Sequence, residues 1–426
     1  MVLLSKNIVD INFQRIGYLS FLFAIFSIII LAVHNQFLPP LMITWGLFWL
    51  FEFISRKGKI SADENKTVLL LCCFLIFYFW FISGLFYSEN KRIGILLVFR
   101  RLSFAVFPII LFSPGIEIKR RIHMLLKTFT LGTIAFLIFC FCYALFRSIV
   151  VENGSWIFNP MKPEEPWLNF FYGQELSFNQ HHSYISMYSL MAMFISFELF
   201  TDKKINSRVR IFWLIAGLFL FISLYFLSSR AAYLATIFIL PGYLLIKLGK
   251  KRVNAISIGA ILFILICISS VYIYNQRVRI IFENPNDTAS LNDERLGIWK
   301  SAINVIQKYP LIGVGTGDSF DKLENEFKLL GYTQGFYKNL NAHNQYLETL
   351  ISSGVIGLFF FLVIFGVMIF YAIKDRNTLY GVFIIMMLIF FIFESMLERL
   401  AGVSFFSLFS FLLMHLKCPV QESLEK

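Results

Sequence analysis

One histidine and a few arginines have the side chains best suited to chemistry in this sequence. His343 lies in the run Asn-Ala-His-Asn-Gln-Tyr, where a polar stretch gives way to a long apolar one. Imidazole titrates near neutral pH, so His343 could act as a general base. Arg230 lies between two apolar runs with almost no loop around it, and Arg100 and Arg101 lie inside another apolar run. Because guanidinium groups fork onto phosphate and pyrophosphate, these residues predict a site for a phosphorylated substrate beside a base.

Several further residues are weaker candidates for the same site. Arg295 begins an amphipathic stretch, where an ordinary solvated surface position is the more common explanation for an arginine. Glu398 and Arg399 could be a simple helix-end ion pair. Four further residues are supporting candidates. Asn344 and Tyr346 follow His343 in the sequence, and His181 and His182 occupy the matching position at the start of another apolar run.

The sequence predicts neither a metal centre nor a nucleotide-phosphate loop. The histidines show no HxxxH or HExxH spacing, and no carboxylates are arranged around them. The glycine-rich run 313–317 lacks the Gly-Lys-Ser/Thr that would follow in a P-loop, so we interpret it as a tight turn. The six cysteines show no CxxC spacing, and we interpret them as small buried hydrophobic residues.

The elements that must position these residues are membrane helices. Of the 426 residues, 58% are hydrophobic and only 15% are charged, whereas soluble domains carry roughly 45–50% and about 25%. This composition excludes a water-soluble enzyme, a disordered chain and a disulfide scaffold. It predicts an all-α polytopic membrane protein, because the apolar runs are long and continuous rather than alternating as in a β-barrel.

About twelve apolar stretches are long enough to cross a bilayer. They cover approximately 16–33, 38–54, 67–87, 95–112, 124–147, 182–200, 211–228, 231–247, 254–274, 346–372, 379–394 and 400–416. The sequence therefore divides into helices one to nine (1–274), a large external loop (275–345), and helices ten to twelve with a tail (346–426).

Lysine and arginine gather in alternate loops, which fixes the orientation. Short loops such as 56–59, 119–121 and 250–252 are cationic, and both termini belong to this set. We therefore expect both termini in the cytoplasm and the two long loops, 148–181 and 275–345, outside. Most of the +12 net charge is explained in this way, without a nucleic-acid partner. The remaining arginines, Glu398 and His343 then fall on the outer side together.

The long loop has helical periodicity of its own. Asp293 can cap a helix that ends at Pro310, with apolar positions at Leu296, Trp299, Ile303 and Ile306. A second amphipathic stretch runs from about 320 to 330. We expect a small external helical subdomain, whereas loop 148–181 is distinguished only by its Trp, Pro and Asn content.

Three groups of residues give the chain a family resemblance. They are Ser229-Arg-Ala-Ala-Tyr-Leu-Ala; Arg295-Leu-Gly-Ile-Trp with Tyr309-Pro-Leu-Ile-Gly-Val-Gly; and Ala342-His-Asn-Gln-Tyr-Leu with Gly354-Val-Ile-Gly-Leu. In this order and spacing they resemble the motifs of the O-antigen ligase and O-antigen polymerase family. One departure is Ala231, where the family more often has glycine, and it exchanges one small residue for another.

The resemblance implies a metal-independent, inverting glycosyltransferase of the bacterial inner membrane that needs no cofactor. Its donor would be a glycan on undecaprenyl pyrophosphate, used at the periplasmic face. In a ligase the acceptor is a sugar hydroxyl of lipid A-core, and in a polymerase it is another lipid-linked glycan. By motif, His343 would be the general base, and Arg230 and Arg295 would hold the pyrophosphate. We favour the ligase.

A transporter or flippase for lipid-linked anions is an alternative from another class. It would use Arg100, Arg101 and Arg230 to bind its substrate in a central cavity. Discontinuous helices and repeated halves would support it, and the sequence shows no such repeat.

Overall fold

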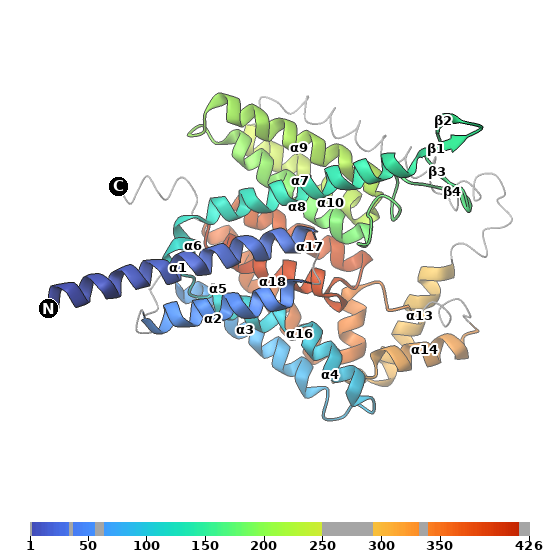
Figure 1. The fold of residues 1–426 in the computed structure, drawn as a ribbon. Coiled ribbons are helices and arrows are strands. Elements are labelled where there is room, and N and C mark those ends of the chain that lie inside the picture. The colour runs from blue at the N-terminus through green and yellow to red at the C-terminus, as the bar shows by residue number, and fades with distance from the viewer. Residues whose placement is uncertain (1, 34–36, 56–63, 249–292, 332–339, 417–426) are drawn as a thin grey trace. The chain divides into compact units, whose positions relative to one another are not determined.

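The computed structural model describes residues 2–33, 37–55, 64–248, 293–331 and 340–416, and it is mainly helical (Figure 1). Its contacts divide the chain into two compact units. Unit 1 comprises 1–129, 298–384 and 395–426, and unit 2 comprises 130–297 and 385–394. Unit 2 therefore interrupts unit 1 twice along the sequence. The predicted all-α membrane fold is confirmed, because nine helical stretches among the described residues are long and apolar enough to cross a membrane, with Lys91–Leu111 (α4 and α5 below) counted as one stretch.

Unit 1 contains most of the helices. They are α1 (Val2–Val33), α2 (Leu38–Ser55), α3 (Asn65–Ser83), α4 (Lys91–Arg100), α5 (Ser103–Leu111), α6 (Ile116–Arg120), α14 (Ser319–Leu329), α16 (Gln345–Lys374), the 3₁₀ turn η5 (Met396–Glu398) and α18 (Leu400–Met414). Three more helices, α7 (Ile122–Arg147), α13 (Asp293–Lys308) and α17 (Thr378–Phe393), cross from one unit into the other. The predicted ninth span, 254–274, lies outside the described residues.

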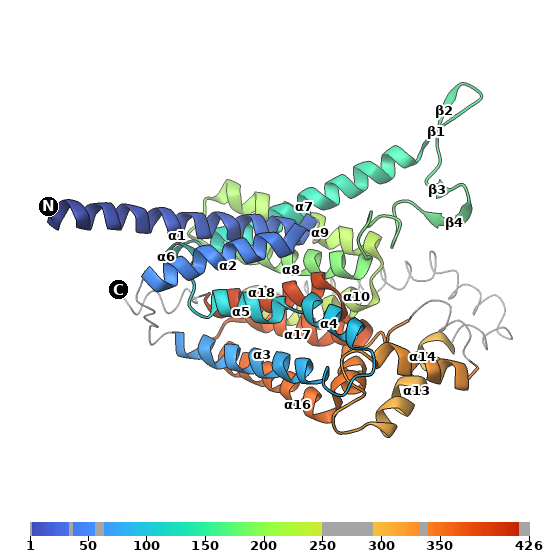
Figure 2. The ribbon, with the colours of Figure 1, turned by 60° about the horizontal axis from the view of Figure 1, so that its bottom comes forward.

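Helix pairs build the core of unit 1. Helix α1 packs along α2, α3 along α16, and α5 along α18 (Figures 1 and 2). Phenylalanine rings fill the centre: the Phe74 ring lies 5.2 Å from that of Phe104 and 5.5 Å from that of Phe406. Stacked and tilted rings of this kind contribute roughly 0.5–1.5 kcal/mol per pair beyond the area they bury. Part of the high phenylalanine content therefore stabilises this helix packing.

The predicted fourth span, 95–112, is two helices rather than one. Helix α4 ends at Arg100 and α5 begins at Ser103, so Arg101 and Leu102 form the break. The Ser103 and Ser404 hydroxyls, 2.8 Å apart, join the start of α5 to α18. The consequence is that both arginines lie at a helix break near the middle of the stretch Lys91–Leu111.

Helix α16 is broken at Gly354, which has φ 65° and ψ −169°. Only glycine occupies this region readily, since it has no Cβ. A Cβ at position 354 would also overlap the carbonyl oxygen of Leu311. A break of this kind frees backbone groups that an intact helix would pair internally, and buried groups of this type need other partners.

The segment 310–315 supplies most of those partners. Val314 and Gly315 donate their N–H groups to the carbonyls of Ile351 (2.8 Å) and Ser352 (3.1 Å). In return, the N–H of Val355 donates to the carbonyl of Pro310 (2.9 Å).

Two further hydrogen bonds complete the pairing at the break. Ile356 donates its N–H to the carbonyl of Leu311 (3.3 Å), and the Trp80 indole of α3 donates to Ser353 (3.0 Å). Gly313 is fitted against the break, because a Cβ there would lie 2.6 Å from the Ser352 carbonyl carbon.

The glycine-rich turn also binds the loop that follows α3. Thr316 donates its hydroxyl to the carbonyl of Phe81, and Gly317 donates its N–H to the Ser88 hydroxyl (3.0 Å). Both carboxylate oxygens of Asp318 accept backbone N–H groups, those of Glu89 and Asn90, at 2.8 Å. The interpretation of 313–317 as a tight turn between two helices agrees with this structure.

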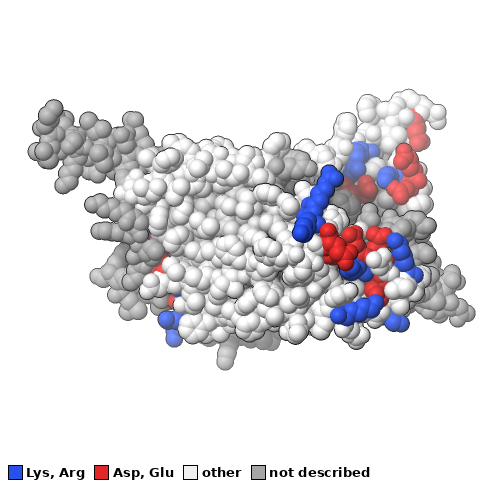
Figure 3. All heavy atoms as spheres, turned by 90° about the horizontal axis from the view of Figure 1, so that it is seen from below, with Lys and Arg blue, Asp and Glu red and all other residues white. Residues whose placement is uncertain are grey.

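The two predicted external helices are present as α13 and α14. Their shared core includes Ile298, Ala302 and Val305 of α13 and Leu323 and Phe327 of α14. Of the apolar positions named for this helix, Trp299 and Ile306 pack against the shared core, whereas Leu296 and Ile303 are exposed. The buried stripe follows the spacing i, i+4, i+7 from Ile298. In Figure 3 charged side chains gather where α13 and α14 lie, and the helical surface beside them is uncharged.

Unit 2 is built around three helices. They are α8 (His182–Thr201), α9 (Ser207–Leu227) and α10 (Arg230–Leu248). Helix α8 packs along α9 and also contacts α10. The Glu198 carboxylate of α8 accepts a hydrogen bond from the Tyr243 hydroxyl (3.0 Å) and pairs with Lys247 (2.7 Å), both of α10.

Loop 148–181 contains two small hairpins that the sequence analysis did not predict. Strand β1 (Ile149–Glu152) pairs with β2 (Ser155–Phe158), and β3 (Met161–Lys162) pairs with β4 (Glu165–Asn169), both antiparallel. Asn153 and Gly154 turn the first hairpin with φ values of 51° and 76°. Asn-Gly between two β-branched or aromatic runs is a strong hairpin signal, so this element was predictable from its residues.

We predict that Gly354→Ala destabilises the protein by about 2–4 kcal/mol, since alanine must adopt a strained conformation and overlap Leu311. Gly366→Ala in the same helix is the matched control. A Cβ at Gly366 meets nothing within 4 Å, and alanine favours a helix by about 0.5–1 kcal/mol over glycine. Equilibrium unfolding in detergent measures both. Equal stability of the two variants would show that the break does not require glycine.

Candidate functional site

His343 lies in a strained loop at the start of α16. Its φ is 45°, in the left-handed region, which costs a non-glycine residue roughly 1–2 kcal/mol. The side-chain oxygen of Asn341 accepts the His343 N–H at 3.0 Å and stabilises this turn. Asn344 then caps α16 by accepting the N–H groups of Tyr346 (2.9 Å) and Leu347 (3.1 Å). Strain of this kind is concentrated at functional sites.

Glu348, one turn into α16, is a buried carboxylate facing this loop. It is 5% exposed, and its Oε2 accepts the backbone N–H of Ala342 at 3.0 Å. It also interacts electrostatically with Arg101 and His343. A buried carboxylate is stable only when it is paired and hydrogen-bonded. Glu348 therefore ties the residue before His343 to the helix and balances part of the positive charge nearby.

The turn between α17 and α18 holds the other side of the loop. The Ser395 hydroxyl accepts the Asn344 N–H at 3.2 Å. The buried side-chain oxygen of Gln345 accepts the N–H of Leu397 in η5 at 2.7 Å. These two contacts place Glu398, the last residue of η5, close to the start of α16.

Glu398 forms an ion pair with Arg101 at the break between α4 and α5. The Arg101 guanidinium is buried and lies 3.9 Å from the centre of the Phe81 ring. Neighbouring Arg100 is exposed, and its Nη1 donates to the Glu398 carbonyl at 3.4 Å. In unit 1 the structure thus brings together four predicted site residues: Arg100, Arg101, Glu398 and His343, the last in the loop 341–344 (the His343 loop).

The two arginines are not equivalent in this arrangement. Arg101 forms an ion pair with Glu398 and a cation–π contact with Phe81. Its buried Nε has no hydrogen-bond partner among the described residues. Arg100 keeps an exposed guanidinium. Arg100 is therefore the better placed of the two to meet an anion from solvent, whereas Arg101 orients the turn that holds the His343 loop.

Tyr346, a supporting candidate, is partly buried in the first turn of α16. Its ring lies 6.2 Å from that of Phe361 in the same helix. This position suits packing in the first turn of α16.

Arg230 belongs to unit 2 and is the first residue of α10. Ser228 ends α9 with φ 51°, and the Ser229 hydroxyl accepts the Ala232 N–H (3.4 Å) in the first turn of α10. The Arg230 side chain is exposed and makes no ion pair or hydrogen bond with any residue that the structure describes. Helix N-termini carry a partial positive charge, so this arginine reinforces a position already suited to an anion.

His181 and His182 also lie in unit 2, at the start of α8. Their rings stack at 4.6 Å, His181 caps the helix by accepting the Ser183 N–H at 3.4 Å, and His182 Nδ1 lies 3.2 Å from the side-chain oxygen of Gln174. Across the described ranges, no group of three His, Cys, Asp or Glu residues could hold a metal. Capping and packing account for both histidines.

Arg295 lies in the first turn of α13. Nothing further is described of its side chain, so its part in the site stays a prediction, as do the roles of Arg230 and His343.

Sequence reasoning missed two residues that hold the His343 loop. Glu348 lies among apolar residues, where a carboxylate is expensive, so its position alone could have marked it. Ser395 gave no such signal, because a small hydroxyl residue near a helix end is common and its partner, Asn344, is 51 residues away.

Comparison with known proteins agrees with the resemblance seen in the sequence. Residues 214–362 match the model of the family described as O-Antigen ligase. This range contains Arg230, Arg295, His343 and the break at Gly354. A protein of Haemophilus influenzae, itself described only as uncharacterized, is 23% identical over 373 residues, which is 83% of each chain. The predicted resemblance to this family is thereby confirmed. It implies a multi-pass membrane protein that acts as a glycan ligase or polymerase on a lipid-linked glycan and an acceptor.

We predict that Glu398→Ala lowers the free energy of unfolding by about 3–5 kcal/mol, because it leaves the buried Arg101 charge unpaired. Lys328→Ala is the control: it breaks a half-exposed pair with Glu324 (2.9 Å) within α14, and pairs of this kind contribute about 0.5 kcal/mol or less. Equilibrium unfolding in detergent compares them. If both variants lose the same small amount, the Arg101–Glu398 pair does not hold the site together.

Proposed function

We propose that this chain is a glycosyltransferase that moves a glycan from undecaprenyl pyrophosphate to a sugar hydroxyl at the periplasmic face of the bacterial inner membrane. We further propose that the acceptor is lipid A-core, which makes the protein an O-antigen ligase. The family match over 214–362 carries the proposal, because it covers the three motifs in which Arg230, Arg295 and His343 occur.

His343 acts as the general base in the proposed reaction. Its neutral imidazole accepts the proton of the acceptor hydroxyl while that oxygen attacks the anomeric carbon of the donor sugar. The bond from the anomeric carbon to the pyrophosphate oxygen breaks, and the pyrophosphate leaves with the electron pair. A single direct displacement inverts the anomeric centre. The side-chain oxygens of Asn341, Glu348 and Ser395 accept the backbone N–H groups of residues 342–344, and these hydrogen bonds support a fixed position for the imidazole.

Arginines stabilise the leaving group in place of a metal. Arg230 and Arg295 hold the pyrophosphate, and Arg100 adds an exposed cation near the His343 loop. Cations placed where negative charge develops lower the barrier without any proton transfer. Arg101 acts as a positioning residue through Glu398, which differs from the pyrophosphate role expected from the sequence. Both termini lie in the cytoplasm in this proposal.

The transporter alternative draws support from helix breaks, and this chain has breaks at Arg101 and at Gly354. In transporters the freed backbone groups coordinate the transported ion or substrate. Here the carbonyls of 351–353 and the N–H groups of 355–356 are already bonded to 310–315 and Trp80. The break in α16 is therefore better suited to fixing an external loop than to binding cargo.

We predict that His343→Ala slows glycan transfer by about 10²–10⁴-fold and Arg230→Ala by about 10²–10³-fold. Transfer is measured with the purified protein, a lipid pyrophosphate donor and a defined acceptor. His123→Ala and Arg208→Ala, which remove exposed residues at the starts of α7 and α9, are the controls and should keep full activity. Normal rates for both site variants, with unchanged unfolding midpoints, would refute the site assignment.

Deletion in the native host separates ligase from polymerase, because the two enzymes leave different products. We expect lipopolysaccharide gels to show core without any attached glycan, as a missing ligase requires. Complementation with the His343→Ala gene should leave the same pattern. Core that carries a single repeat unit would instead identify a polymerase and overturn the ligase assignment.

A further inference from the structure

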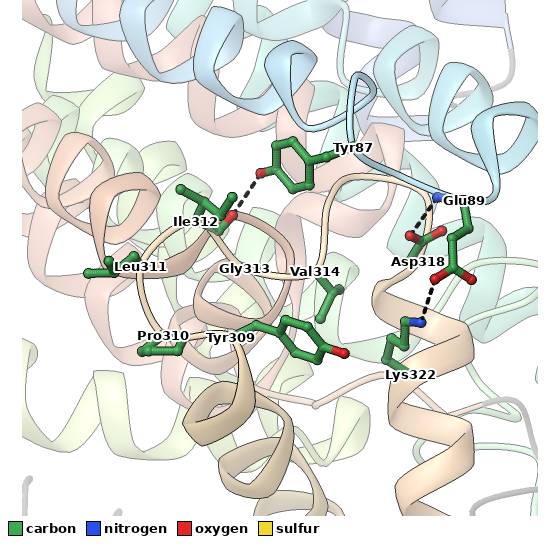
Figure 4. A pocket seen from close by; sticks show the side chains of 10 residues that line it. All are labelled: Tyr87, Glu89, Tyr309, Pro310, Leu311, Ile312, Gly313, Val314, Asp318 and Lys322. Carbon is green, nitrogen blue, oxygen red and sulfur yellow. Dashed lines mark hydrogen bonds and ion pairs between the residues drawn. The ribbon is translucent and has the colours of Figure 1, made fainter.

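A pocket of about 330 Å³ lies in unit 1 between the segment 309–314, the start of α14 and the loop after α3. Figure 4 shows the rings of Tyr87 and Tyr309 on its walls and the charged groups of Glu89 and Lys322 on one side. Its volume falls at the lower end of the range of about 300–1,000 Å³ for small-molecule sites. None of its lining residues belongs to the His343 loop.

The apolar walls of the pocket present aromatic rings. Tyr309 is 44% exposed although it follows a helix with a well-packed core. The Tyr87 hydroxyl donates to the Ile312 carbonyl at 2.7 Å, which fixes the ring in place. Aromatic faces carry partial negative charge and attract the partially positive C–H groups of a flat ligand face. Such rings suit the apolar face of a pyranose.

The polar groups of the pocket favour a neutral, hydroxyl-rich ligand over a phosphate. Lys322 Nζ lies 3.0 Å from the Glu89 carboxylate, and this hydrogen bond raises the pKa of Lys322. Asp318 adds a second negative charge, with its oxygens bound to backbone N–H groups. The lining therefore holds two carboxylates and one ammonium, which disfavours an anion. Sugar hydroxyls can both donate to Glu89 and accept from Lys322.

The pocket wall is hydrogen-bonded to the helix that follows the candidate base. Residues 310–315 are hydrogen-bonded to α16 at 351–356, and α16 begins two residues after His343. From Gln345 to Ile351 the helix rises about 9 Å. A glycan that occupies the pocket would thus be held against the helix that directly follows the base.

We propose that this pocket is a saccharide subsite that binds a pyranose residue of the glycan substrate at a point away from the reacting bond. The proposal rests on the proposed function for the identity of the glycan, which belongs either to the donor chain or to the acceptor. The pyranose stacks on Tyr309, and its hydroxyls bind Glu89 and Lys322.

The test is direct binding to the full-length protein in detergent. Two probes separate the sources: the soluble repeat-unit oligosaccharide of the host polysaccharide, and the core oligosaccharide of its lipopolysaccharide. We expect one of them to bind, with affinity lowered about tenfold by Tyr309→Ala, and lowered by less by Tyr309→Phe, which keeps the ring. Lys322→Ala should weaken binding about fivefold. Leu329→Ala, which removes a 74% exposed side chain of α14 outside the pocket, should change nothing.

Two results would overturn the subsite. One is that each probe binds Tyr309→Ala and Lys322→Ala with the same affinity as it binds the wild-type protein, while the unfolding midpoints of the variants are unchanged. The other is displacement of the bound oligosaccharide by inorganic pyrophosphate, which would indicate an anion site instead.

Failure of the subsite and failure of the proposed function give different results. If His343→Ala binds the oligosaccharide normally but transfers nothing, both proposals stand. If the wild-type protein transfers nothing yet binds the oligosaccharide through Tyr309, only the transferase proposal fails. If the wild-type protein transfers glycan but substitutions of Tyr309 and Lys322 leave the oligosaccharide affinity unchanged, only the subsite proposal fails.

Discussion

Backbone polar groups in an apolar environment must find partners within the protein, and the break in α16 at Gly354 exposes five of them. The segment 310–315 pairs with four of these groups, and Trp80 of α3 pairs with the fifth. The segment 310–315 is therefore part of the helix packing, because its backbone completes the hydrogen bonding of α16. The start of α16, on which the His343 loop is built, is fixed by the same bonds.

The candidate site is held together by buried charges of opposite sign. Arg101 is buried beside Phe81 and is neutralised by Glu398, and Glu348 is buried beside both Arg101 and His343. Each charge would be unfavourable alone, so the three elements that carry them have to meet. These contacts fix the residues around His343, which is itself only partly buried, and they leave Arg100 exposed nearby.

The sequence was sufficient for features that depend on composition or local periodicity. Apolar run length predicted most of the membrane helices, and the helical spacing within 293–330 predicted α13 and α14. The break at Gly354 was not predictable, since Gly366 occurs in an equally apolar part of the same helix and causes no break. What distinguishes Gly354 is the carbonyl of Leu311, 43 residues away. In the same way, the residue types at 100, 101, 343 and 398 indicated a site, but the contacts of Glu348 and Ser395 arise only from tertiary packing.

The contacts of Asp318 also set an order for biosynthesis. The N–H groups of Glu89 and Asn90 find their acceptor on a residue that is made only when roughly three quarters of the chain exists. All of 130–297, which forms most of the other compact unit, is synthesised in between. The loop between α3 and α4 therefore lacks its hydrogen bonds to Asp318 while that unit is synthesised. Such a delay is expected when contacts are distant in sequence. A ribosome stalled before residue 318 would carry a chain whose loop between α3 and α4 still lacks the acceptor for two of its backbone N–H groups.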